Sequence, residues 1–186
     1  MIYKDFIICI IGKSGSGKST IVRHYKEKGY NIIESYTDRP KRFDNEWGHV
    51  FIKSSEVEFY RHEMIAYTFY DGYHYFSIKS QYKNKGITFY VIEPSGVKAI
   101  KDKVKDAELL FIYIDVDEAV RKERMLLRLK ENILLDCDYE KVNRDIEKRI
   151  INDREIFKKV DCNIVIDNNY NMEDTISIID DIIMTL

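Results

Sequence analysis

A segment near the N-terminus has the residue types and the spacing of a phosphate-binding loop. Gly12 to Ser19 reads GKSGSGKS, which fits the pattern GxxxxGK[ST] at every fixed position. Glycines in such a loop let successive backbone N–H groups point at one phosphate, and the dipole of the following helix attracts the same anion. Lys18 is then expected to contact the β- and γ-phosphates, and the Ser19 hydroxyl to bind Mg²⁺. The sequence thus predicts an ATP site formed by Gly12, Lys13, Ser14, Gly15, Ser16, Gly17, Lys18, Ser19 and Thr20.

The end of this motif distinguishes a phosphate site from a plain tight turn. A Gly/Ser turn needs no Lys-Ser pair after it, whereas Lys18 and Ser19 here stand between a buried apolar segment and an amphipathic one. That strand–loop–helix context is the one the motif requires. The chain has no NKxD-type motif for a guanine base, which argues against a regulatory GTPase.

A second cationic segment suits a second phosphate. Ser35 to Arg42 reads SYTDRPKR and places three cations in four positions around Pro40. A kinase must hold its acceptor in line with the γ-phosphate. The planar fork of Arg39 can pair two phosphate oxygens at once, which a lysine cannot do. The segment predicts an acceptor-phosphate site, and a solvated basic loop is the alternative.

Further arginines lie in two segments that we expect to be helical. Arg124 and Arg128 are four residues apart and share a helix face. Two arginine-bearing helices joined by a short connection suit a lid over a phosphate, because each arginine offers about 4 kcal/mol of gross attraction at about 4 Å and an effective dielectric of about 20. Ordinary surface ion pairs, worth about 0–1 kcal/mol each, are the alternative, because acids are interspersed with these arginines. The acids are Glu123, Glu140, Glu147 and Asp153. The arginines are Arg121, Arg124 and Arg128 in the first segment, and Arg144, Arg149 and Arg154 in the second.

Glu93 follows the apolar run from Phe89 to Ile92 and precedes Pro94. It therefore stands at the carboxyl end of an expected strand, where a carboxylate can bind Mg²⁺ through water or orient a substrate. A turn residue is the alternative.

The elements that must position these groups alternate between strand and helix. Apolar runs predict strands over 6–11, 31–33, 87–92, 109–114 and 164–166, and helical patterns cover 18–28, 97–105, 118–132, 139–160 and 172 to the end. Alternation of this kind predicts a parallel sheet with helices on both faces. The stretch from Gly48 to Ser77 interrupts it. Two aromatic runs, Met64 to Tyr70 and Tyr73 to Ile78, flank Asp71-Gly72 and predict a small antiparallel hairpin.

Composition narrows the class of protein. A chain of 186 residues, 45% hydrophobic and 33% charged, suits one compact domain and excludes a disordered tail or a membrane-embedded protein. The longest early apolar run, Phe6 to Ile11, is too short for a spanning helix or a signal peptide, so we expect a cytoplasmic protein. Three cysteines without a CxxC pair give no disulfide framework or zinc site. A net charge of −2 argues against nucleic acid as a partner.

The order of these features resembles the guanylate kinase family of P-loop nucleoside monophosphate kinases over nearly the whole chain. Beyond the phosphate loop, Ser35 to Arg42 is similar to the family's acceptor-phosphate loop, and Gly48 to Ile52 is similar to the strand after it. Tyr73 to Ser77 is similar to the family's Asn-Tyr-Tyr-Gly-Ser/Thr segment.

The resemblance implies an α/β fold, a P-loop kinase with a parallel sheet flanked by helices, a small antiparallel acceptor-binding insertion and a helical lid. The core would comprise residues 1–35, 87–121 and 160–186, the insertion residues 36–86 and the lid region residues 122–159. The implied reaction is transfer of the γ-phosphoryl of ATP, with Mg²⁺, to a nucleoside monophosphate, with GMP the first choice. Small-molecule nucleotides are the implied partners of a monomer or homodimer.

The family's functional residues match particular positions here. Arg124 and Arg128 match the lid arginines, and Arg149 matches the arginine that returns from the lid helix, so these three are expected to act in catalysis with Lys18. Asp167 falls in the donor-base loop. The expected acceptor-binding residues are Ser35, Arg39, Arg42, His49, Tyr75, Ser77 and Glu93.

Departures from the family pattern cluster where the acceptor base would be recognised. Ala66 stands in place of a glutamate that accepts from the guanine edge, and such hydrogen bonds supply large discrimination factors. His49 replaces a tyrosine, Phe76 a glycine and Ile166 an asparagine. Two alternatives therefore stay open: a kinase for another phosphorylated acceptor, such as a different nucleotide or a sugar phosphate, and a binding module of this fold without catalysis. The intact phosphate loop argues against the binding module.

Overall fold

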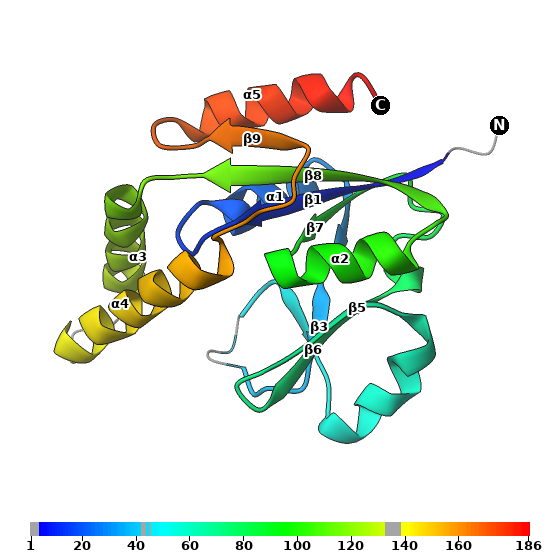
Figure 1. Ribbon diagram of the computed structural model, residues 1–186, viewed down its shortest axis with the longest axis horizontal. Helices are drawn as coiled ribbons and strands as arrows, with labels where there is room; N and C mark the ends of the chain where they lie inside the picture. Colours follow the sequence, from blue (N-terminus) through cyan, green and yellow to red (C-terminus); the bar gives the residue numbers. More distant parts are fainter. Residues whose placement is uncertain (1–3, 42–43, 45, 133–138) are drawn as a thin grey trace.

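The computed structural model describes residues 4–41, 44, 46–132 and 139–186 and has two sheets with helices packed around them (Figure 1). Five parallel strands form the main sheet in the order β2-β7-β1-β8-β9. Four strands form the second sheet in the order β4-β3-β6-β5. The elements in chain order are β1 (Asp5–Gly12), α1 (Lys18–Glu27), β2 (Asn31–Ile33), β3 (Ser35–Thr37), β4 (His49–Phe51), the 3₁₀ helix η1 (Ser54–Glu63), β5 (Met64–Tyr70), β6 (Tyr73–Ile78), the 3₁₀ helix η2 (Lys79–Gln81), β7 (Ile87–Val91), α2 (Pro94–Lys103), β8 (Ala107–Asp115), α3 (Glu118–Asn132), α4 (Tyr139–Ile156), β9 (Ile164–Asp167) and α5 (Met172–Ile183).

The main sheet is buried on both faces because its central strand is apolar at every position from Ile7 to Ile11. The even-numbered side chains of β1, Ile8 and Ile10, pack with residues of α1 and α5 on one face. The odd-numbered side chains pack with α2 on the other face, together with Ile65 of β5. These two layers place the phosphate loop at the carboxyl end of β1, between the sheet and α1.

The second sheet has one face packed on its own small core and one face turned to the interior of the molecule. Phe76 and Ile78 of β6 pack with Val57 of η1, with Tyr36 of β3 against them. Since side chains alternate along a strand, Tyr75 of β6 and its cross-strand neighbour Thr68 of β5 lie on the opposite face. The insertion therefore presents residues such as Thr68 and Tyr75 to a shared space below α2.

Helices α3 and α4 extend from the carboxyl end of the main sheet as a pair (Figure 1). Met125 of α3 packs against Ile146 and Ile150 of α4 in a small separate core. This pair occupies the region expected to form the lid.

The structure confirms the predicted fold class and most element boundaries. The hairpin lies at the predicted residues, and Asp71 (φ 51°) and Gly72 (φ 80°) both adopt the left-handed conformation that a two-residue turn of this type requires. Helix α2 begins three residues earlier than the expected Val97, because Pro94 is well tolerated in the first helical turn. The second sheet is antiparallel except for β4, which pairs with β3 in parallel. Among the described helices, none combines the length and apolar character needed to cross a bilayer.

Asp106 links the end of the insertion to the start of β8. Its carboxylate accepts hydrogen bonds from the Tyr82 hydroxyl at 2.7 Å and from Lys83 Nζ at 2.9 Å, and it pairs with Lys79 Nζ at 2.7 Å. The hydrogen bond from Lys79, followed by those from Tyr82 and Lys83, holds the pKa of Asp106 well below its ordinary value.

A pH-dependent loss of stability follows from this link. A carboxylate with a depressed pKa in the folded state stabilises the protein above its unfolded pKa, about 3.9, and that stabilisation is lost as the pH falls toward the folded value. Asp106→Asn is expected to reduce stability at pH 7 by about 1–2 kcal/mol, roughly 2–8 °C in Tm, and the difference should shrink below about pH 4. Thermal melts from pH 3 to 8 measure it. Asp102→Asn is the control, because Asp102 is an exposed carboxylate on α2. A loss of Tm in Asp106→Asn that stays constant with pH would contradict this explanation.

Candidate active site

The phosphate loop joins β1 to α1 and is fixed from several sides. Ser16 N donates to Lys13 O at 3.1 Å, and Lys18 Nζ donates to the same carbonyl at 2.9 Å. From outside the loop, Asn168 Nδ2 donates to Ser16 O at 3.0 Å. The hydroxyl of Ser16 is buried and has no hydrogen-bond partner within the described residues. A glycine-rich loop before a helix N-terminus suits an anion as ligand, because its successive backbone N–H groups can point at it.

Two glycines of the loop are required by geometry. Gly15 has φ 80°, and a Cβ at this position would lie 2.7 Å from the carbonyl oxygen of Arg121. Gly17 has φ 96°, and a Cβ there would lie 2.8 Å from Asn168 Nδ2. Left-handed conformations cost other residues about 1–2 kcal/mol each. Close packing and backbone conformation therefore both exclude a side chain at these two positions.

A cavity of about 140 Å³ opens above the loop. The loop forms its floor, and Met125 and Arg128 of α3 and Arg149 of α4 form the opposite wall. The two arginines thus face the loop from separate helices, as a lid over a polyphosphate requires. The residues that line it are Ser14, Gly15, Gly17, Lys18, Ser19, Met125, Arg128 and Arg149.

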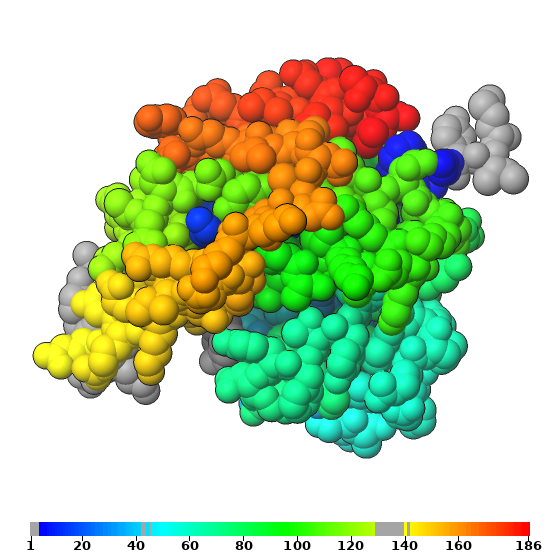
Figure 2. Space-filling model, viewed as in Figure 1, coloured from blue at the N-terminus to red at the C-terminus, as the bar shows by residue number. Residues whose placement is uncertain are grey.

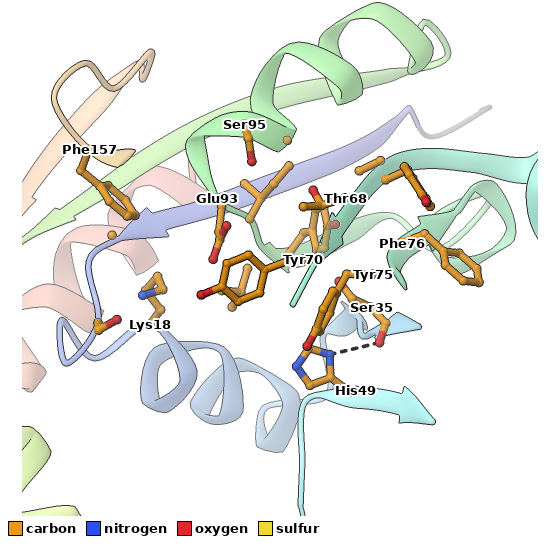
Figure 3. A pocket seen from close by; sticks show the side chains of 18 of the residues that line it. Lys18, Ser35, His49, Thr68, Tyr70, Tyr75, Phe76, Glu93, Ser95 and Phe157 are labelled. Carbon is orange, nitrogen blue, oxygen red and sulfur yellow. Dashed lines mark hydrogen bonds between the residues drawn. The ribbon is translucent and has the colours of Figure 1, made fainter. Parts of the chain in front are cut away.

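A second, larger cavity of about 350 Å³ lies between the phosphate loop and the inner face of the insertion (Figure 3). Its volume lies within the range of small-molecule sites, about 300–1,000 Å³. On the insertion side the labelled side chains of Ser35, His49 and Tyr75 cluster together, and Tyr70 extends from the hairpin toward Lys18. His49 Nδ1 lies 3.3 Å from the carbonyl oxygen of Ser35. The space-filling view shows the insertion, in cyan and green, packed beneath the core (Figure 2).

The two cavities share Ser14 and Lys18. Desolvation lowers the pKa of Lys18 to about 8, while the charges of Asp153 and Glu93 act in the opposite direction. Glu93 lines the larger cavity just before the first residue of α2, and desolvation raises its pKa, with Lys18 opposing that shift. A cation and two carboxylates therefore meet where the two cavities join.

The residues around the smaller cavity fit a magnesium ion that arrives with a nucleotide. The Ser19 hydroxyl is one hard oxygen donor, of the kind Mg²⁺ prefers, and Mg²⁺ usually takes its other ligands from phosphates and water. Over the described part of the chain, no group of three or more His, Cys, Asp or Glu side chains could hold a metal by itself.

Most of the predicted residues are brought together at these two cavities. Gly12, Ser14, Gly15, Gly17, Lys18, Ser19, Arg128 and Arg149 line one or both, and Ser35, His49, Tyr75 and Glu93 line the larger one. Lys13 and Ser16 lie within the loop and line neither cavity, and Thr20 continues α1 with an exposed side chain.

Other predicted residues lie outside the cavity walls. Arg39 is buried and forms a two-pronged ion pair with Glu46, through Nη1–Oε2 at 2.8 Å and Nη2–Oε1 at 2.6 Å. Ser77 is buried and donates to the Tyr90 hydroxyl at 3.0 Å, so it reaches the cavity through Tyr90. Arg42 lies outside the described residues.

Two further predicted residues, the lid arginine Arg124 and the donor-base residue Asp167, contact the loop between β9 and α5. Arg124 Nη2 donates to the carbonyls of Asn168 at 2.9 Å and Asn169 at 3.3 Å. Asp167 accepts from Asn169 N at 2.8 Å. Both residues therefore lie next to Asn168, which touches the phosphate loop, and neither lines the two cavities.

Several residues at the site were not predicted from the sequence, among them Tyr70, Asn168 and the three discussed next. Asp153, treated above as one of the interspersed acids, is buried and accepts from Ser14 N at 2.8 Å. Its spacing of four residues from Arg149 was a usable signal, because such pairs share a helix face. Thr68 and Tyr90 line the larger cavity, and only the pairing of their strands reveals which face each presents.

Comparison with solved structures finds the same fold in a guanylate kinase from Anaplasma phagocytophilum. The TM-score is 0.61 and the alignment covers 98% of this chain and 86% of that chain, at 14% sequence identity. No protein-family model matches the sequence, and no curated protein matches it. The similarity is thus one of fold: a P-loop kinase-like α/β fold with an inserted second sheet.

Proposed function

We propose that the protein is an ATP-dependent nucleoside monophosphate kinase, with GMP the leading acceptor and GDP its product. The observation that carries this proposal is the meeting of two cavities at Ser14 and Lys18. A nucleotide hydrolase needs one polyphosphate site, whereas phosphoryl transfer needs a second site in line with it. The larger cavity supplies the space for an acceptor on the far side of Lys18.

Charge neutralisation is the main chemical contribution of the site. Lys18 would neutralise charge on the β- and γ-phosphates, and Arg128 and Arg149 would approach the transferring group from the lid. An acceptor phosphate is already anionic at neutral pH, so the reaction requires no side-chain base. Mg²⁺, held by Ser19 and by the nucleotide, would offset negative charge that develops during transfer.

The regions of the chain divide accordingly. Residues 36–86 would hold the acceptor, residues 122–159 would act as the lid, and the remainder would form the nucleotide-binding core. A phosphoryl-transfer enzyme that acts on free nucleotides would work in the cytoplasm.

The proposal is tested by ADP release from Mg·ATP with a panel of acceptors: GMP, dGMP, AMP, CMP, UMP and phosphorylated sugars. Turnover with GMP supports the leading proposal. ATP binding without transfer to any acceptor would refute it and favour a binding module.

A second candidate, a kinase for another phosphorylated acceptor, is favoured by the wall of the larger cavity. The insertion contributes neutral side chains to that wall, including Ala66, Thr68 and Tyr75. The acids among the described lining residues are Glu93 and Asp153, both on the core and lid side. Without a carboxylate facing the base, guanine has no ionised partner for its adjacent N–H donors, so selectivity for it would be weaker. Faster turnover of a non-guanine acceptor in the same panel would decide for this candidate.

Arg39 is the predicted residue whose role most needs a direct test. Its guanidinium also interacts with Tyr75, which lines the larger cavity. Arg39→Lys keeps a cation beside the buried Glu46 but loses the planar fork. We expect the acceptor KM to rise about 10-fold while the Kd for ATP is unchanged, since one charge-assisted contact is worth about 1.5–3 kcal/mol. Steady-state kinetics and ATP titration measure both. A fall in Tm with an unchanged acceptor KM would mean that Arg39 only holds Glu46.

A further inference from the structure

A buried carboxylate joins the phosphate loop to both lid helices. Asp153 Oδ2 accepts from Ser14 N at 2.8 Å and from Arg121 Nη1 at 3.1 Å, and Oδ1 lies 3.4 Å from Ser14 Oγ. Arg121 Nη1 also donates to Ser14 O at 3.2 Å. Asp153 is 6% exposed and Arg121 is 1% exposed. Three segments, the loop, α3 and α4, thus meet at one ion pair from which water is largely excluded.

The lid arginines lie a short distance along the same helix faces. Arg149 precedes Asp153 by four residues on α4 and shares a helix face with it. Arg128 follows Arg121 by seven residues on α3, so these two also share a face. Met125, between Arg121 and Arg128, packs against Ile146 and Ile150 of α4 and keeps the two helices together. Anchoring the helices at Asp153 therefore fixes where both arginines lie over the cavity.

Two ion pairs between α4 and α3, within the described part of the chain, do not provide this anchor. The ion pairs Arg154–Glu118 and Lys122–Glu147 join α4 to α3 at the exposed surface and do not reach the phosphate loop. Exposed pairs also contribute little, about 0–1 kcal/mol, and are weakened by salt. The hydrogen bonds from Ser14 to Asp153 are partly buried and act on the loop itself.

We propose that Asp153 is a positioning residue for phosphoryl transfer, which ties the Ser14 amide to α4 and thereby aims Arg149 at the transferring group. The inference rests on the proposed function and extends it. Asp153 acts through Ser14 and Arg149 rather than by contact with the reacting atoms. If it did no more than stabilise the fold, its removal would lower Tm without altering what Arg149 contributes.

A double-mutant cycle distinguishes these two roles. Asp153→Asn, Arg149→Ala and the double variant are compared for kcat and for the Kd of Mg·ATP, with Tm recorded for each. We expect Asp153→Asn to lower kcat about 10- to 100-fold, as misplacement by about 1 Å can do. In that background Arg149→Ala should cost less than 3-fold more, because the arginine is already misplaced. If the fold-losses in kcat of the two single variants multiply fully in the double variant, the proposal is overturned.

Two more variants keep the test decisive. Asp153→Glu retains the charge beside Arg121 but moves the carboxylate by one methylene, so it should fold even where the loss of charge in Asp153→Asn is damaging. Asp153→Glu should show the same coupling to Arg149→Ala in kcat. Independent effects of these two substitutions on kcat would again overturn the proposal. Asp145→Asn is the matched control, since Asp145 is an exposed carboxylate on the same helix, and it should leave kcat and Tm unchanged.

The cycle also separates this inference from the proposed function. If the wild-type protein binds Mg·ATP but transfers phosphate to no acceptor, the proposed function fails, yet the cycle can still be measured on the Kd of Mg·ATP. If the effects of Asp153→Asn and Arg149→Ala on the Kd of Mg·ATP are coupled, Asp153 still positions Arg149 at the triphosphate. Independent effects on Kd would refute that role as well.

Discussion

Lys18→Ala is expected to lower kcat at least 1,000-fold, a loss of about 4 kcal/mol of transition-state stabilisation. Lys18 is the cation common to both cavities, and its desolvated ammonium is poised against Glu93 and Asp153. With its Nζ atom removed, the transferring group would lose the charge nearest to both phosphate sites, and the negative charges of Glu93 and Asp153 would no longer be offset by Lys18.

The measurement is steady-state turnover with the best acceptor from the panel, together with the Kd of Mg·ATP and the Tm. Lys98→Ala is the control, since Lys98 is an exposed lysine on α2. Near-normal turnover of Lys18→Ala would exclude the assigned role. If the Tm of Lys18→Ala falls to the assay temperature, turnover of both proteins is compared at a lower temperature, where the variant is folded.

Gly15→Ala is expected to weaken Mg·ATP binding at least 100-fold, in line with the cost of displacing a binding group by about 1 Å. The added Cβ would meet the backbone oxygen of Arg121 at 2.7 Å. Backbone at the start of α3 cannot rotate away as a side chain could, because Arg121 is held by Asp153 and by Val116 O. The loop would have to move instead, and its amides would no longer converge on one phosphate.

Gly29→Ala is the matched control for this substitution. Gly29 has a similar φ of 91°, yet an added Cβ there would have no atom within 4 Å. Both variants carry the same backbone strain, about 1–2 kcal/mol, and only Gly15→Ala also carries the steric clash. Isothermal titration should show weakened Mg·ATP binding for Gly15→Ala alone. Thermal melts should show a lower Tm for both variants, with the larger loss in Gly15→Ala. Equal ATP affinity in the two variants would contradict the assignment of the loop.

Local sequence was sufficient for the main sheet and for the hairpin of the insertion. Period, apolar runs and glycine positions act over neighbouring residues, and β1, α1, β5 and β6 accordingly lie where the sequence predicts them. The beginning of α2 was predicted three residues too late. Pro94 breaks the apolar pattern of the strand before it, yet it is also well tolerated as the first residue of a helix. The parallel pairing of β4 with β3 was not predictable, since it depends on which distant strand is nearest.

The candidate site divides in the same way. The phosphate loop is one continuous motif, so the sequence by itself determined the loop, its lysine and the serine that suits Mg²⁺. The acceptor-side wall draws Ser35, Tyr75 and Tyr90 from three separate strands, and strand pairing decides which face each presents. Asp153 looked like a surface acid, and it is buried because α4 returns to the loop 139 residues earlier in the chain. Contacts between residues so far apart arise only from tertiary packing, whereas a loop whose groups all lie within eight residues carries its geometry in its own sequence.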